Sequence, residues 1–384
     1  MAANGTPMRA ESRLTAVQSD PVALRLRAVH RAVAEQRRGT PVVITAKMPL
    51  VALAAEMAGA QGLADFAAVA AAPPALVLSP VRAASVLHRP VPPGQPAAFR
   101  TAGLLDPALL RGLADPTADQ LLAEPPQSVA APPGAEAALV LAKLARLLPA
   151  MLVAPTRPDA AGQAAQLGLL SAPGEDILRH PAAESAALAR VAEAHVPLAD
   201  APDARVAAFR APDGGIEHLA ILVGRPEDQP RAEPAPLVRV HSECFTGDLL
   251  GSLRCDCGPQ LRTALARMAA EGTGVLVYLA QEGRGIGLVN KLRAYALQDR
   301  GLDTLDANRA LGWDADERRF LAAAAILEAV GVRRMRLLTN NPDKVAGLAA
   351  CGLEVAAREP LIIPPNGVDD HYLATKARRL GHLL

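Results

Sequence analysis

The feature that most constrains how this chain can fold is a group of three cysteines within 14 residues, at Cys244, Cys255 and Cys257. Their spacing, C-x10-C-x-C, is poor evidence for a disulfide framework and better evidence for a metal site. Thiolates suit Zn²⁺, and catalytic zinc sites use three protein ligands and leave a fourth position for water. Ordinary buried thiols are the alternative, but the neighbouring residues in the sequence are polar. We therefore expect an open zinc site, unless His241 supplies a fourth ligand and closes it.

Composition limits the other possibilities. With 384 residues and 51% hydrophobic content, the chain is long enough for two or three domains with a sizeable core. The net charge is +1 and no basic tract is present, so we expect no nucleic-acid partner. No apolar run reaches the length of a membrane span, and the N-terminus shows no apolar signal segment. We therefore expect a cytoplasmic protein without a membrane partner.

The N-terminal half alternates between helical and extended patterns. Residues 1–22 are polar and are expected to be disordered. Apolar periodicity predicts a helix at 21–36, and a β-rich run predicts a strand at 41–45. Residues 48–57 are interpreted as a second helix and 75–78 as a buried strand. This alternation indicates an α/β fold.

The C-terminal half opens with two predicted strands, 206–210 and 218–223, around a Gly-rich turn, which together indicate a hairpin. Further strands are predicted at 237–241, 275–279, 335–338 and 353–356, and helices at 259–270, 286–298 and 316–330. Asn341 is expected to cap one more helix, with Pro342 at its first position. The second half is therefore also expected to be α/β, around a mixed sheet.

A Gly-rich segment at 281–288 follows one predicted strand and opens a predicted helix. Glycines there let backbone N–H groups approach an anion at the positive end of the helix. Such turns are also common structural features, so this segment alone supports a functional role and a purely structural turn about equally. Arg284 suits phosphate, and the Glu282 carboxylate could accept hydrogen bonds from guanine.

Two other polar segments have both a structural and a functional interpretation. The charged run 314–319 has the pattern of a solvated helix start, with acids that favour the helix dipole. Thr339 and Lys344, around the helix start at Asn341, fit phosphate binding, although capping alone explains the Asn-Pro pair.

Taken together, the order of these motifs resembles the GTP cyclohydrolase II family. The segments that carry the likeness are 239–244, 252–258, 281–284, 315–318 and 337–342. The likeness continues from about residue 237 to the C-terminus, and the hairpin at 206–223 matches the family's start. It implies conversion of GTP to formate, pyrophosphate and 2,5-diamino-6-(5-phosphoribosylamino)pyrimidin-4(3H)-one. That reaction is the first committed step of riboflavin biosynthesis.

The resemblance also assigns roles to individual residues. It implies one zinc ion per subunit on the three cysteines, with His241 beside the metal, and Mg²⁺ on the GTP triphosphate. Asp316 corresponds to the general base, and Tyr295 to an active-site tyrosine. Arg318 corresponds to a nucleophile at the α-phosphorus, although a protonated guanidinium is better suited to stabilising phosphoryl charge. The implied substrate contacts are Arg239, Val240, His241, Ser242, Glu243, Gln260, Glu282, Gly283, Arg284, Thr304, Thr339 and Lys344.

The N-terminal half, residues 23–186, faintly resembles 3,4-dihydroxy-2-butanone 4-phosphate synthase, a domain often fused ahead of a cyclohydrolase. Where that family carries an acidic metal-binding motif, this chain has the segment 45–49, which contains no acid. We therefore expect a degenerate domain without synthase activity, which serves in scaffolding, dimerisation or regulation. The cyclohydrolase domain is expected at 187–384, in a homodimer.

Two alternatives remain at this stage. One is a related cyclohydrolase that keeps the zinc site but acts on another substrate, such as a pyrimidine. The other is a GTP-binding regulatory protein without catalysis. Retention of the guanine and triphosphate contacts disfavours the first, and retention of Asp316, Arg318 and the three thiols disfavours the second.

Overall fold

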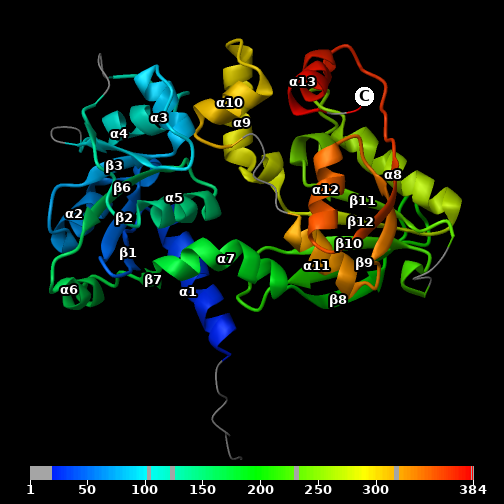
Figure 1. The fold of residues 1–384 in the computed structure, drawn as a ribbon, viewed down its shortest axis with the longest axis horizontal. Coiled ribbons are helices and arrows are strands. Elements are labelled where there is room, and N and C mark those ends of the chain that lie inside the picture. Colours follow the sequence, from blue (N-terminus) through cyan, green and yellow to red (C-terminus); the bar gives the residue numbers. More distant parts are fainter. Residues whose placement is uncertain are drawn as a thin grey trace, which may run out of the picture.

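The computed structural model describes residues 20–101, 105–121, 126–228, 233–314, 320–381 and 383. Two seven-stranded sheets, one in each half of the chain, are flanked by helices (Figure 1). The α/β class and the division into two halves are as the sequence predicts. Within the described residues, no helix is long and apolar enough to cross a membrane.

The N-terminal sheet has the strand order β5-β4-β3-β6-β2-β1-β7. Its strands are β1 (Val42–Thr45), β2 (Leu50–Ala54), β3 (Ala75–Leu78), β4 (Ala97–Arg100), β5 (Ser128–Val129), β6 (Ala150–Pro155) and β7 (Ser171–Pro173). Neighbouring strands are antiparallel, except for β1 and β7, which are parallel. The predicted strands 41–45 and 75–78 are therefore confirmed as β1 and β3.

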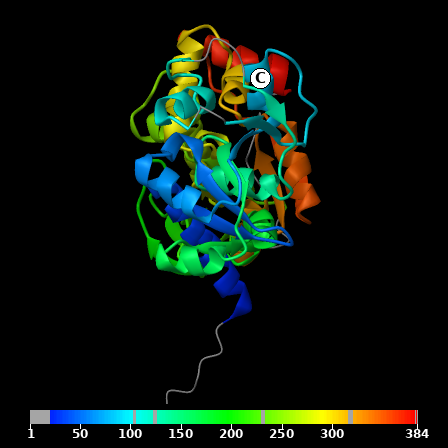
Figure 2. The ribbon, with the colours of Figure 1, turned by 90° about the vertical axis from the view of Figure 1, so that its left-hand side faces the viewer.

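Helices cover both faces of this sheet. They are α1 (Pro21–Arg38), η1 (Ala55–Met57), α2 (Ala60–Val69), α3 (Pro80–Leu87), α4 (Pro107–Ala114), α5 (Ala135–Leu144), α6 (Ala160–Gln166) and α7 (Gly174–Ala186). Because side chains alternate along a strand, Val43 packs in one core while Val42 and Ile44 pack in the other. Figure 2 faces this half of the molecule.

Two predictions for the N-terminal half need correction. The helix predicted at 48–57 is wrong, because that segment forms β2 and the short turn η1. β2 lies between β1 and β6 and is buried along its whole length. In a short apolar run, periodicity does not distinguish a buried strand from a buried helix. The disorder predicted for 1–22 is wrong at its end, since α1 begins at Pro21 with Asp20 as its cap. Residues 1–19 lie outside the described residues.

The C-terminal sheet has the order β14-β13-β11-β12-β10-β9-β8. Its strands are β8 (Ala189–His195), β9 (Arg205–Arg210), β10 (His218–Val223), β11 (Leu237–Ser242), β12 (Gly274–Leu279), β13 (Arg334–Leu338) and β14 (Glu354–Glu359). β9 and β10 form the predicted hairpin. The four strands β12, β11, β13 and β14 run parallel to one another.

The helices of this half are η2 (Pro226–Asp228), the π-helical turn η3 (Phe245–Leu249), α8 (Cys257–Glu271), η4 (Glu282–Gly285), α9 (Leu288–Asp299), α10 (Thr304–Ala310), α11 (Leu321–Ala329), α12 (Pro342–Ala350) and α13 (Asp370–Leu380). Of these, α8, α9, α11 and α12 correspond to predicted helices, whereas α10 and α13 were not predicted. The Asn341 side chain accepts a hydrogen bond from the Asp343 N–H at 2.9 Å, which confirms the predicted cap. The start predicted for α11 at residue 316 lies outside the described residues.

The two halves share one hydrophobic core. Ile286, Ala294, Leu297 and Trp313 belong to the C-terminal half, yet they are buried in the core on one face of the N-terminal sheet. Helix α10 accordingly packs beside α3, and α9 packs against α10 (Figure 1). On the opposite face, α7 packs against α1 and α5 and also against α11. The halves are therefore joined by packing as well as by the chain.

Candidate active site

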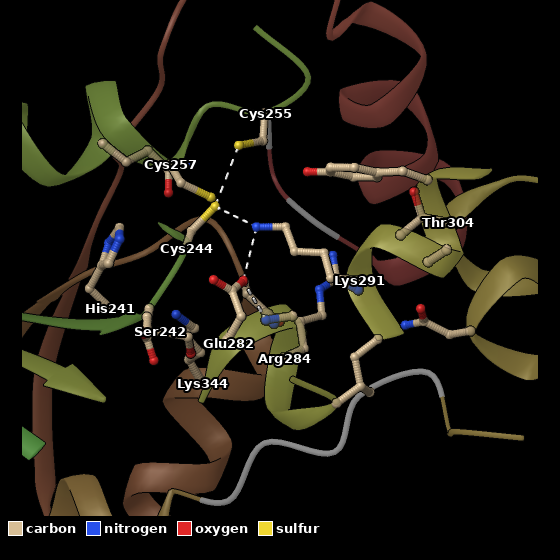
Figure 3. A pocket seen from close by; sticks show the side chains of 18 of the residues that line it. His241, Ser242, Cys244, Cys255, Cys257, Glu282, Arg284, Lys291, Thr304 and Lys344 are labelled. Atoms are coloured by element: carbon tan, nitrogen blue, oxygen red, sulfur yellow. Dashed lines mark hydrogen bonds and ion pairs between the residues drawn. The ribbon is translucent and has the colours of Figure 1, made fainter. Parts of the chain in front are cut away.

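The pocket lies where three parallel strands end. Glu243 follows β11, Gln281 follows β12 and Thr339 follows β13. The carboxyl ends of parallel strands meet at one edge of a sheet, which is where ligands bind in open α/β folds. Side chains from all three strand ends line one cavity, with α9 and α10 as the opposite wall (Figure 3).

The three cysteines meet at this edge. Their sulfur atoms all lie within 4.8 Å of one another, and the Cys244 and Cys255 sulfurs are 3.7 Å apart. A tetrahedral zinc with Zn–S bonds of about 2.3 Å holds two sulfurs roughly 3.8 Å apart. Gly247 packs against the group, because a Cβ there would lie 2.8 Å from the Cys255 sulfur and 2.9 Å from that of Cys244. The donor set therefore fits zinc.

His241 is engaged elsewhere. Its Nε2 lies 3.1 Å from the Asp248 carboxylate, and its ring stacks on that of Tyr278. Asp248 also accepts hydrogen bonds from the Tyr278 hydroxyl at 2.9 Å and from the Cys244 backbone N–H at 3.0 Å. Burial lowers the pKa of His241. Among the described residues, the group placed to hold a metal contains the three cysteines and not His241, which favours the open site.

Lys291 is a functional candidate that the sequence analysis missed. Its Nζ donates to the Cys244 sulfur at 3.0 Å and to Glu282 Oε1 at 2.9 Å (Figure 3). Burial opposes its charge, but the hydrogen bonds to Cys244 and Glu282 raise its pKa above the ordinary value. One signal was available, because Lys291 and Tyr295 are four residues apart on α9 and so share a helix face.

The thiols also affect one another. Hydrogen bonds from Cys255 and then from Cys257 lower the pKa of Cys244 far below its ordinary value. The contact with Cys244 in turn raises the pKa of Cys255 to about 11, and it also raises the pKa of Cys257. Cys244, whose sulfur Lys291 contacts, is therefore the most acidic of the three thiols.

The Gly-rich segment forms a tight turn around Glu282. Gly283 and Arg284 both have left-handed backbone angles, with φ of 63° and 65°. Glu282 is buried, and its carboxylate accepts from the Phe245 N–H at 2.6 Å, from the Gly283 N–H at 2.8 Å and from Lys291. Both carboxylate oxygens therefore bind groups of the protein itself. The left-handed conformation is uncommon for arginine, and it occurs here at the cavity wall.

A second wall is cationic. The Arg239 guanidinium donates to the Leu338 carbonyl at 3.0 Å and to Gln260 Oε1 at 2.5 Å. Lys344, in the first turn of α12, donates to the Val240 carbonyl at 2.8 Å. Arg239 and Lys344 are both buried and line the cavity together with Arg284. Arg239 and Lys344 therefore place positive charge near the start of α12, and Arg284 adds a further positive charge to the cavity from the Gly-rich turn.

The opposite wall comes from α9 and α10. Burial raises the pKa of Tyr295 to about 12, so its hydroxyl stays protonated near neutral pH. The Arg254 guanidinium lies 5.0 Å from the centre of the Tyr295 ring. Thr304 begins α10, whose cap Asp303 accepts from the Asp306 N–H at 2.9 Å. Tyr295 and Thr304 thus line the cavity from α9 and α10.

Most of the residues implied by the resemblance lie together. Those that line the cavity are Arg239, His241, Ser242, Glu243, Cys244, Cys255, Cys257, Gln260, Glu282, Gly283, Arg284, Tyr295, Thr304, Thr339 and Lys344. Val240 differs, because its side chain is buried in the core of this half and only its carbonyl bonds Lys344. The lining residues that the sequence analysis missed are Ile286, Lys291, Ala294, Gln298, Asn308, Asn340 and Asn341. Asp316 and Arg318 lie outside the described residues.

Known proteins resemble the chain over both halves. The family described as GTP cyclohydrolase II matches residues 189–360. A GTP cyclohydrolase-2 from Azospirillum brasilense is 47% identical over 367 residues, which cover 93% of this chain and 94% of the relative. A GTP cyclohydrolase-2 from Haemophilus influenzae (strain PittGG) is 49% identical over 180 residues, which cover 47% of this chain and 82% of the relative. The first likeness therefore extends into the N-terminal half, whereas the second covers less than half of the chain.

Among solved structures, a two-domain 3,4-dihydroxy-2-butanone 4-phosphate synthase from A. baumannii covers 88% of this chain and 99% of its own length. The two are 19% identical, with a TM-score of 0.34. That score is too low to argue for a shared fold.

Proposed function

The chain belongs to the GTP cyclohydrolase II family, and from that premise we propose that its pocket binds GTP and opens the guanine ring by hydrolysis. The products would be formate, pyrophosphate and 2,5-diamino-6-(5-phosphoribosylamino)pyrimidin-4(3H)-one. The observation that carries the proposal is geometric. Three sulfur atoms at the separation of zinc ligands face the same cavity as Arg239, Arg284 and Lys344.

The metal end of the pocket is built by residues around Cys244. The three cysteines would hold one zinc ion per subunit, which when bound supplies a Lewis acid that lowers the pKa of water toward neutrality. Lys291 holds the Cys244 sulfur by a hydrogen bond and offsets the negative charge of the thiolates. Asp248 fixes the backbone of Cys244 through its N–H. These contacts pre-organise the ligands, as partners behind a metal ligand do in other sites.

The cationic wall is the proposed place of the triphosphate. Arginine and lysine side chains form strong charge-assisted hydrogen bonds with phosphate oxygens. The start of α12 adds the positive end of the helix dipole, whereas the N–H groups of Asn341 and Asp343 bond side chains of the protein itself. Arg239, Arg284 and Lys344 would bind the triphosphate there, together with Mg²⁺.

Glu243 is the better-placed carboxylate for the guanine base. The oxygens of Glu282 already accept three hydrogen bonds from the protein. Glu243 is half-buried in the same cavity, and burial, together with the charge of Glu282, raises its pKa. Its carboxylate can accept the N1–H and the amino group of guanine, and Tyr295, which stays protonated, can donate from the opposite wall.

The remaining roles come from the family pattern. Asp316 would act as the general base, and Arg318 would stabilise charge on the phosphoryl group. We further propose a cytoplasmic homodimer. The N-terminal half would lack synthase activity, because the loop between β1 and β2 contains Lys47 and Met48 where the synthase family needs acids.

The test is a product assay on the zinc-loaded full-length protein. Incubation with GTP and Mg²⁺ should release formate, pyrophosphate and the pyrimidine in equal amounts, and ribulose 5-phosphate should remain unchanged. Formate from a pyrimidine substrate but not from GTP would favour a related cyclohydrolase. Binding of GTP without any product would favour the regulatory protein. Turnover of ribulose 5-phosphate would contradict the inactive N-terminal half.

A further inference from the structure

The pocket is also held from outside, by the N-terminal half. Both backbone groups of Ala280, just before the Gly-rich turn 281–287, are hydrogen-bonded. Its carbonyl accepts from Arg146 Nη2 at 2.7 Å, and its N–H donates to His218 Nδ1 at 3.0 Å. Arg146 belongs to the loop between α5 and β6 of the N-terminal half. The start of the turn is thus fixed by a residue 134 positions away in the sequence.

Arg146 also holds the far end of the same turn. Its side chain packs against Gly287, where an added Cβ would lie 3.1 Å from both the Cβ and the Cδ of Arg146. Its carbonyl accepts from Asn290 Nδ2 at 3.0 Å, and Asn290 is fully buried. One residue therefore bridges both ends of the turn that carries Glu282.

The backbone of Arg146 is consistent with a role for its side chain. Its φ of 56° lies in the left-handed region, where glycine has no steric cost and arginine does. The arginine side chain supplies the hydrogen bond to Ala280 and the packing against Gly287 that glycine would lack.

A second contact of the N-terminal half holds helix α9. Arg293 lies 3.2 Å from Glu56 in η1 and 2.8 Å from Asp115 at the end of α4, and both carboxylates are nearly buried. Lys291 and Tyr295, two residues to either side of Arg293, line the pocket. The orientation of that pocket wall is therefore coupled to the N-terminal half.

We propose that the N-terminal half is an intramolecular positioning module for the nucleotide pocket, with Arg146 as the positioning residue that sets the turn 281–287. This inference rests on the proposed function, in which that turn contacts GTP. The shared core supports it, since the apolar face of α9 and α10 is covered by the N-terminal half. The module thus has a role that requires no catalytic residue of its own.

Three variants of the full-length protein test this. Arg146→Ala and Arg146→Gly both remove the side chain, and Gly also removes the backbone cost. Arg157→Ala is the matched control, because Arg157 likewise donates to a carbonyl, that of Ala70 at 2.9 Å, but within the N-terminal half. The measurements are kcat and KM for GTP, bound zinc, melting temperature, and hydrogen exchange of amides 281–287 without substrate.

We expect both Arg146 variants to lose about 10- to 100-fold in kcat/KM, mainly through a higher KM. Bound zinc should stay at the wild-type level, and exchange in 281–287 should become at least about tenfold faster. Arg146→Gly should melt at or above Arg146→Ala, so that loss of activity is separated from loss of stability. Arg157→Ala should match the wild type in kcat/KM and exchange.

Two results would overturn the inference. One is Arg146 variants with kcat/KM within about twofold of the wild type and unchanged exchange in the turn. The other is an equal loss in Arg157→Ala, which would show that the effect is not specific to this contact. If the wild type releases no formate, the proposed function fails instead, and the exchange data alone then decide whether Arg146 positions the turn.

Discussion

The two halves of the molecule have the same number of strands but differ in strand direction. In the N-terminal sheet only β1 and β7 are parallel, whereas β12, β11, β13 and β14 form a parallel block in the C-terminal sheet. The carboxyl ends of the parallel strands β11, β12 and β13 converge on one edge, and the three cysteines, the Gly-rich turn and the cationic side chains line one cavity there. In this molecule, strand direction separates the half that contains the pocket from the half for which we propose a positioning role.

The supporting half still contributes to the site. Arg146 and Glu56 contact the turn and the helix that form one side of the pocket, without lining the pocket themselves. Within the described residues, the N-terminal sheet, with a single parallel pair, thus contacts the pocket only through the elements that it holds in place. We therefore expect changes at the cysteines to abolish turnover, and changes at the contact between the halves to alter stability and the positioning of the pocket wall.

The largest expected effect follows from removing one metal ligand. Cys255→Ser should lower turnover of GTP at least about 1000-fold, equivalent to about 4 kcal/mol of transition-state stabilisation, because three ligands are the minimum for a catalytic zinc. Zinc content by mass spectrometry and formate release would measure it. Cys351→Ser is the matched control, since Cys351 ends α12, outside the metal group. A zinc-free Cys255→Ser protein with full turnover would contradict the assignment of chemistry to this edge.

The second prediction concerns the shared core. Trp313 is the single tryptophan of the chain, is 1% exposed, and lies in the core common to both halves. Trp313→Ala should lower the free energy of unfolding by about 3 kcal/mol through the cavity it leaves. Because the halves share this core, unfolding followed by circular dichroism should remain a single transition that shifts as a whole.

Phe209→Ala is the control for this prediction, because Phe209 is fully buried in a core made only by the C-terminal half. In the wild type, tryptophan fluorescence and circular dichroism should report the same midpoint, since Trp313 lies between the halves. Two separate unfolding transitions in the wild type would contradict the positioning role of the N-terminal half, because the halves would then unfold independently.

The sequence predicts the C-terminal half better than the N-terminal half, for a physical reason. The helix after Asn341 has a local signal, a capping side chain followed by Pro342, and the structure confirms it. The segment 50–54 has none, because an apolar run of five residues suits a buried strand and a buried helix equally. Its strand identity comes from pairing with β1 and β6, which is tertiary information.

The same distinction applies to the site. The three cysteines lie close together in the sequence, so their spacing predicts the group that the structure brings together. Lys291 contacts Cys244 across 47 positions, and Arg146 contacts Ala280 across 134. The four-residue spacing from Tyr295 marks Lys291 as sharing its helix face, but no local pattern encodes contacts of that range, and the predictions left both residues out.

The smallest effect concerns His218, which holds the Ala280 N–H opposite Arg146. Burial, and then the charge of Arg146, lowers the pKa of His218 to about 4. An unfolded histidine titrates near 6.5, so between those pH values the unfolded chain binds the proton more strongly. The contribution of His218 to stability is therefore complete above pH 6.5 and is lost as the pH falls toward 4. From pH 7 to pH 5 the loss should be about 2 kcal/mol.

His218→Asn isolates this contribution, because the Asn side-chain oxygen can accept from the Ala280 N–H without titrating. Denaturant unfolding at pH 7 and pH 5 should show a difference about 2 kcal/mol smaller in the variant than in the wild type. His88→Asn serves as the control, since His88 is exposed at the end of α3 and its left-handed backbone suits asparagine. An equal pH dependence of the free energy of unfolding in His218→Asn and the wild type would mean that a neutral histidine does not hold the Ala280 N–H. The proposal that the turn is fixed from both halves would then depend on Arg146 alone.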